Sequence, residues 1–129
     1  MGNRDGKIII GPGLNVWPHE LRTAEALARA GHTVEFVRKS EVDHQRTPDV
    51  LIDGVPFEMK APKSGRIDMI HKNVRRALRQ ANCVVFDSRR MKVLPDRAIE
   101  RELRARAEEA RSLRRLLYIN RHGKVVNIK

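Results

Sequence analysis

The pattern of apolar and polar positions along the chain predicts short strands that alternate with amphipathic helices. In the first helix, apolar residues recur at the spacing of one helical face, between Pro18, a favourable first residue, and a stop at Gly31. Two further helices are predicted at 67–81 and 95–111. Short runs of β-branched and aromatic residues predict strands at 33–37, 49–52, 55–60, 83–86, 116–120 and 124–128.

The order of these elements predicts an α/β layer architecture. From Pro18 to Phe86 the chain has a helix, three strands, a helix and a strand, and a C-terminal helix and β-hairpin follow. The segment between strands 55–60 and 83–86 is long enough for a parallel crossover. We expect one domain over 1–129, in which residues 1–16 form an N-terminal arm or edge strand and residues 17–128 form the core, with a polar loop at 39–46.

The segment from Asp49 to Lys60 carries the most informative chemistry. Asp53-Gly54 between two apolar runs predicts a tight hairpin turn, so residues whose numbers sum to 107 would face each other. Asp49 then lies opposite Glu58, and Lys60 points to the same face as Glu58. Two carboxylates at this distance repel each other unless a cation lies between them. Asp53 faces away from the pair and is interpreted as a turn residue.

Glu20 adds a third acid from the preceding helix. The predicted buried stripe of that helix includes Leu21, Ala24 and Leu27, and Glu20 falls inside it. A carboxylate on a buried face is costly unless it is paired or bound to a metal. The alternative is a first-turn glutamate that stabilises the N-terminus of the helix.

The charge of the chain predicts a polyanionic partner. Lys and Arg number 27 against 16 acids, which leaves a net charge of +11 and a pI near 10.8. Nucleic acid is the first expectation and an anionic membrane surface the second. The apolar runs are far shorter than the roughly 20 residues of a transmembrane helix. The single cysteine, Cys83, excludes an intrachain disulfide and a cysteine-based zinc site.

Several polar residues after the hairpin are candidates for contact with phosphates. Lys63 and Ser64 lie in the loop that follows the strand of Glu58. One stripe of the helix at 67–81, either that of His71, Arg75 and Arg79 or that of Lys72 and Arg76, would face a nucleic acid. Gln80 could lie at the edge of the site. For each of them a solvated surface position is the alternative.

Two features of the sequence resemble known nucleases. Pro48-Asp49, eight residues and then Glu58-Met59-Lys60 resemble the PD-(D/E)xK signature, and the order of elements resembles the restriction-endonuclease-like core of that superfamily. The surrounding sequence resembles the C-terminal tRNA nuclease domains of contact-dependent growth inhibition toxins of the CdiA type. The resemblance includes the run from Glu58 to Ser64 and the run from Ala77 to Asp87. This resemblance covers about residues 18–128, the nuclease core.

The resemblance implies a role for each acid and for the lysine. Glu20, Asp49 and Glu58 would hold a divalent metal, and Lys60 would assist catalysis. Oxygen ligands favour Mg²⁺, with Mn²⁺ or Zn²⁺ as alternatives. Such a metal would activate water for phosphodiester hydrolysis.

The resemblance also implies a biological setting. The chain would be the C-terminal toxin part of a secreted, cell-surface protein, would cleave tRNA in the cytoplasm of the target cell, and would be neutralised by a cognate immunity protein. Because the chain is basic, we expect that protein to be acidic. The alternatives are a DNA endonuclease of the same fold and a basic nucleic-acid-binding module without catalysis.

Overall fold

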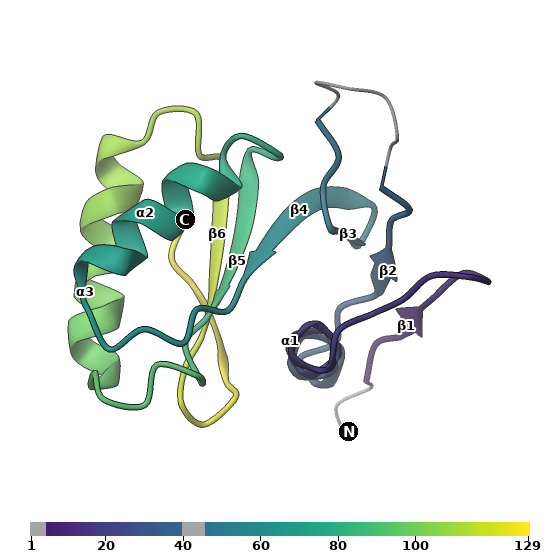
Figure 1. The fold of residues 1–129 in the computed structure, drawn as a ribbon, viewed down its shortest axis with the longest axis horizontal. Coiled ribbons are helices and arrows are strands. Elements are labelled where there is room, and N and C mark those ends of the chain that lie inside the picture. Colours follow the sequence, from purple (N-terminus) through teal and green to yellow (C-terminus); the bar gives the residue numbers. More distant parts are fainter. Residues whose placement is uncertain (1–4, 40–45) are drawn as a thin grey trace.

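Seven strands lie side by side in one mixed sheet, in the order in which they occur along the chain (Figure 1). The computed structural model describes residues 5–39 and 46–129, so most of the predicted loop at 39–46 lies outside the described residues. The strands are β1 (Ile8–Ile9), β2 (Val34–Phe36), β3 (Val50–Ile52), β4 (Val55–Lys60), β5 (Cys83–Asp87), β6 (Arg115–Ile119) and β7 (Val125–Asn127). The helices are α1 (Pro18–Arg29), α2 (Asp68–Ala77) and α3 (Asp96–Glu109).

The connections give the sheet its mixed topology. Strand β1 is parallel to β2, and β4, β5 and β6 are parallel to one another. Each of these parallel pairs is joined through a helix, α1, α2 or α3 in turn. The pairs β2–β3, β3–β4 and β6–β7 are antiparallel. The predicted crossover, the C-terminal helix and the terminal hairpin are therefore confirmed, and the N-terminal run is an edge strand.

Two apolar layers lie on opposite faces of the sheet. On one face, residues of α1 such as Leu27 pack against Phe57 and Val85. On the other, residues of α2 and α3 such as Leu103 pack against Val84. Strand alternation produces this division, since successive side chains point to opposite faces. In β4, Glu58 therefore points away from the face on which α1 packs.

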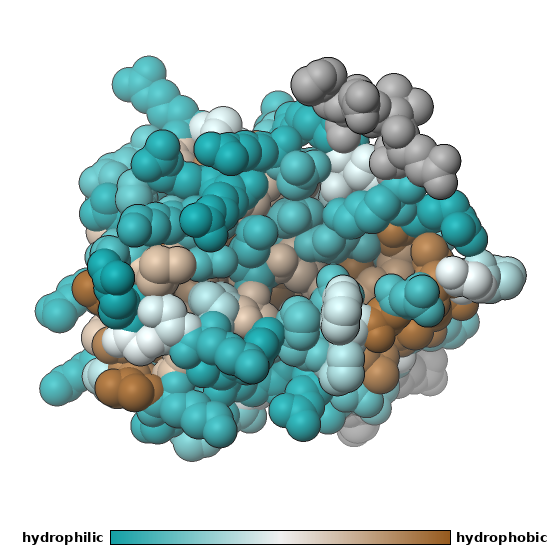
Figure 2. Space-filling model, in the orientation of Figure 1, coloured by the Kyte–Doolittle hydropathy of each residue, from teal (hydrophilic) through white to brown (hydrophobic). Residues whose placement is uncertain are grey.

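Polar side chains cover most of the face seen in Figure 2, as the high net charge predicts. Exposed large apolar residues among those described are few: Ile9, Ile10, Trp17, Ile67 and Val93. Within residues 5–39 and 46–129, no helix is both long enough and apolar enough to cross a membrane.

The central hairpin has the predicted register. Val50 pairs with Phe57, and Ile52 pairs with Val55. Asp53 and Gly54 adopt positive φ angles of 51° and 84°, as a two-residue hairpin turn requires. The Asp53 carboxylate accepts the N–H of Thr33 at 2.9 Å and lies 2.7 Å from Nδ1 of His32. Both contacts lower the pKa of Asp53, and the hydrogen bond with His32 has the larger effect. Asp53 is thus a turn residue, as predicted.

Two helices end earlier than predicted. α2 stops at Ala77 instead of residue 81, because the chain turns there to enter β5. Carbonyls at this end have no partner within the helix, and the side chain of Arg46 donates hydrogen bonds to two of them. Its Nη2 lies 3.3 Å from the carbonyl oxygen of Leu78, and its Nε lies 3.2 Å from that of Arg79. α3 stops at Glu109 instead of residue 111. At that end, Lys129 Nζ donates to the carbonyls of Ala107 at 2.9 Å and Ala110 at 3.2 Å.

Candidate functional site

The hairpin brings Asp49 and Glu58 together. Asp49 immediately precedes β3, and continuation of the register places it opposite Glu58. Its Oδ2 accepts the backbone N–H of Met59 at 2.9 Å, which holds the carboxylate beside β4. Lys60, two residues beyond Glu58, is half-buried at the end of β4. The hairpin therefore brings the two acids together, with Lys60 two residues farther along β4.

Glu58 is the more deeply buried of the two acids. Its side chain is 8% exposed, and Oε1 is buried without a hydrogen-bond partner among the described residues. Burial, followed by the negative charge of Asp49, raises the pKa of Glu58 from 4.5 to about 7, although the charges of Lys39 and Lys60 oppose the rise. A buried carboxylate oxygen that accepts no hydrogen bond and lies beside a second acid favours a nearby cation.

Lys39 is the cation that lies between the two acids. Its Nζ is 2.8 Å from Oδ1 of Asp49 and 4.0 Å from Oε1 of Glu58. It also donates to the carbonyl of Thr47 at 3.1 Å. The side chain is 55% exposed, so it can leave without unpacking the core. The sequence predicts a cation here but does not identify it as Lys39, because Lys39 belongs to the predicted polar loop and only folding carries it to the hairpin.

Glu20 occupies a different position from the predicted one. The buried residues of α1 centre on Thr23, Ala24 and Leu27, and Glu20 is only half-buried. Its Oε1 accepts the backbone N–H of Trp17 at 3.0 Å, which is the helix-start role given above as the alternative.

Glu20 nevertheless lines the same hollow as Asp49 and Lys39, beside the start of α1. Among residues 5–39 and 46–129, no three His, Cys, Asp or Glu side chains are grouped closely enough to hold a metal ion. The structure therefore assembles the Asp49–Glu58 pair and leaves Glu20 at its margin.

The residues predicted to contact nucleic acid are dispersed. Lys63 is exposed in the loop after β4, and Ser64 Oγ accepts the N–H of Arg66 at 3.0 Å. Gln80 Oε1 accepts the N–H of Thr47 at 3.2 Å, so Gln80 holds the segment that leads to Asp49. The remaining three lie on or just after α2, where Arg75 and Arg79 are exposed and His71 is half-buried.

The raised pKa of Glu58 predicts how stability depends on pH. Between about pH 4.5 and 7 the folded chain holds a proton on Glu58 that the unfolded chain has released. The free energy of unfolding should therefore fall as the pH rises through this window and level off above it. Urea unfolding between pH 4 and 8 would measure this fall. The Glu58→Gln variant should lack the part of the fall that the titration of Glu58 causes. Parallel pH profiles for the two proteins would contradict the prediction.

Comparisons with known proteins agree with the sequence resemblance. The chain superposes on a solved structure described as a CdiA-CT/CdiI toxin and immunity complex from Burkholderia pseudomallei, with a TM-score of 0.72 and 22% identity. The match covers 96% of this chain and 99% of that one, and at this identity it shows the shared fold. No curated protein matches the chain. The family model for the contact-dependent growth inhibition CdiA C-terminal domain matches residues 46–125, more than half of the chain, so the protein belongs to this family of toxin domains.

Proposed function

We propose that this domain is a metal-dependent endoribonuclease that cleaves tRNA in target bacteria and so mediates contact-dependent growth inhibition. The observation that carries the proposal is the Asp49–Glu58 pair, in which Oε1 of Glu58 is buried without a hydrogen bond, together with the nearby Lys60. The relation to the PD-(D/E)xK nucleases is part of the same proposal.

The acid pair supplies part of the donor set that a divalent cation would need. Asp49 and Glu58 supply carboxylate oxygens, and Glu20, on the same hollow as Asp49, would complete the set. Oxygen ligands favour Mg²⁺ over softer metals, and Mn²⁺ or Zn²⁺ are alternatives. Lys39 now neutralises the pair, so we expect its ammonium group to leave when a divalent cation binds. A divalent cation held by these carboxylates would supply an activated water and offset negative charge on the phosphate.

Lys60 has a separate role in this mechanism. It lies at the end of β4, and its positive charge acts on Glu58. We propose that its ammonium group orients the attacking water or stabilises the charge that develops on the phosphate. The pairing of Lys60 with Phe86 of β5 fixes the backbone from which this side chain extends.

The proposed setting follows from the family. The domain would be the C-terminal part of a secreted, cell-surface protein and would act in the cytoplasm of the target cell. The similar structure is described as a complex of toxin and immunity protein, and we propose a cognate immunity protein for this chain also. With a net charge of +11 on the toxin, an acidic partner would gain electrostatic attraction.

Side-by-side incubation of total tRNA and plasmid DNA with Mg²⁺, Mn²⁺ or Zn²⁺ tests the proposal. We expect metal-dependent cleavage of tRNA, abolished by a chelator, and an intact plasmid. Cleavage of the plasmid instead would indicate a DNA endonuclease of the same fold. Binding to nucleic acid without cleavage under any of the three metals would indicate a non-catalytic binding module.

A further inference from the structure

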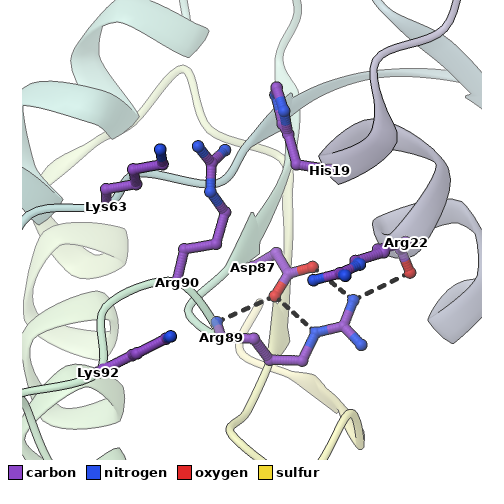
Figure 3. Close-up of a pocket in the computed structure, with 7 residues that line it drawn as sticks. All are labelled: His19, Arg22, Lys63, Asp87, Arg89, Arg90 and Lys92. Carbon is purple, nitrogen blue, oxygen red and sulfur yellow. Dashed lines mark hydrogen bonds and ion pairs between the residues drawn. The ribbon is translucent and has the colours of Figure 1, made fainter.

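A second charged cluster lies beside the first turn of α1 (Figure 3). It surrounds a cavity of about 470 Å³ between α1, the loop after β4 and the loop after β5. We call it the basic pocket, and its lining residues are His19, Arg22, Lys63, Asp87, Arg89, Arg90 and Lys92. No large apolar side chain is among them.

Asp87 and Arg89 form the rigid floor of the basic pocket. Asp87 is 3% exposed, and its Oδ2 accepts the hydroxyl of Thr23 at 2.7 Å and Nη2 of Arg89 at 2.7 Å. Its Oδ1 accepts Nε of Arg89 at 3.0 Å. Nη2 of Arg89 also donates to the carbonyl of Arg22 at 2.9 Å, which ties the floor to α1. Arg89 and Thr23 thus donate hydrogen bonds to the one acid of the pocket, and the charge of Arg89 compensates the charge of that acid.

The other four cations have no such compensation. Within residues 5–39 and 46–129, no carboxylate is within ion-pair distance of Arg22, Lys63, Arg90 or Lys92. The charged ends of Lys63 and Arg90 point toward the same open space as the ring of His19 (Figure 3). Like charges gathered around a concave surface repel one another and attract anions strongly. This part of the fold therefore favours a bound anion.

The basic pocket adjoins the acid pair through two short connections. Arg90 Nη1 donates to the carbonyl of Ala61 at 3.0 Å, and Ala61 directly follows Lys60. In the first turn of α1, His19 lines the basic pocket, whereas Glu20 lines the hollow that contains Asp49. A strand of nucleic acid at the acid pair could therefore reach the pocket across the ends of β4 and β5.

We propose that the basic pocket binds a backbone phosphate of the nucleic acid, at a nucleotide beside the one that is cleaved. This inference rests on the proposed nuclease function. Arginine donates paired hydrogen bonds to phosphate oxygens, and lysine adds point charge. Arg22 and Arg90 would make the paired contacts, and Lys63 and Lys92 would add charge at the rim.

An acidic surface of a partner protein is the competing ligand. Protein interfaces usually place large aromatic or apolar residues at their centre. The basic pocket has a concave polar lining and five cations around one internally paired acid, which suits a compact multivalent anion. The phosphate is therefore the favoured occupant.

Salt-dependent binding of tRNA tests the proposal. Arg22→Gln with Lys92→Gln removes two pocket cations, both exposed and without a side-chain hydrogen bond to another described residue. Arg101→Gln with Arg111→Gln removes the same charge from exposed positions on α3 and just after it. Both pairs of substitutions are made in the Glu58→Gln variant, and a chelator is added, so that the tRNA stays intact. The affinity for fluorescently labelled bulk tRNA is then measured by anisotropy at salt concentrations from 50 to about 300 mM.

We expect the pocket variant to reduce the slope of log K against log salt concentration by about 1 to 2, and the control variant to reduce it by less than half as much. Equal reductions would overturn the proposal. The proposal would also be overturned if the pocket variant kept the salt slope for tRNA binding and bound the purified immunity protein more weakly. Cleavage by the unmodified chain is scored separately. Pocket-dependent binding without cleavage would refute the nuclease function alone, and cleavage with equal slopes would refute the pocket alone.

Discussion

Glu58→Gln is expected to lower the single-turnover rate of tRNA cleavage by a factor on the order of 10³ while leaving the domain at least as stable at pH 8. The substitution keeps the shape of the side chain and removes only its charge. In the folded chain that charge is disfavoured by burial and by Asp49, as the raised pKa shows. Activity and stability should therefore move in opposite directions, which a merely structural residue would not produce.

The experiment compares cleavage rate, tRNA affinity and urea unfolding in three variants. Lys60→Ala should also lose cleavage and keep most of the tRNA affinity. Glu35→Gln, an exposed glutamate of β2, is the matched control and should change none of the three quantities. Cleavage at the unmodified rate in both Glu58→Gln and Lys60→Ala would rule out the proposed mechanism.

Asp87→Ala is expected to lower the free energy of unfolding by about 3 kcal/mol. The change removes four hydrogen bonds to a buried carboxylate, three from Arg89 and one from Thr23. It leaves a partly buried guanidinium without its counter-charge. The corresponding fall in Tm is about 10 °C for a domain of this size.

Asp68→Ala is the control for this prediction. Asp68 forms ion pairs with Arg66 at 2.7 Å and Lys72 at 3.7 Å, but its side chain is 44% exposed. Exposed pairs of this kind contribute less than about 1 kcal/mol. Chemical unfolding of both variants decides the matter, and a loss below about 1 kcal/mol for Asp87→Ala would show that Arg89 finds another partner.

The hairpin and the order of elements were accessible from the sequence because their determinants are local. Asp53-Gly54 specifies a two-residue turn, and the alternation of apolar residues then specifies the register that sets Asp49 against Glu58. Helix and strand positions followed from periodicity in the same way. The helix ends did not, because side chains that are distant in sequence, Arg46 and Lys129, hydrogen-bond the carbonyls at the ends of α2 and α3.

The tertiary structure alone decided which other charges lie near this acid pair. Glu20 has the periodicity of a buried residue, but the packing of α1 leaves it half-exposed, where it accepts a backbone N–H at the start of the helix. The long side chain of Lys39 reaches the acid pair from a segment whose local pattern says only that it is polar. The basic pocket joins three segments separated by dozens of residues, so no spacing in the sequence could reveal it. Local sequence patterns determined the hairpin that carries the site. Long-range packing determined which further charged side chains surround it.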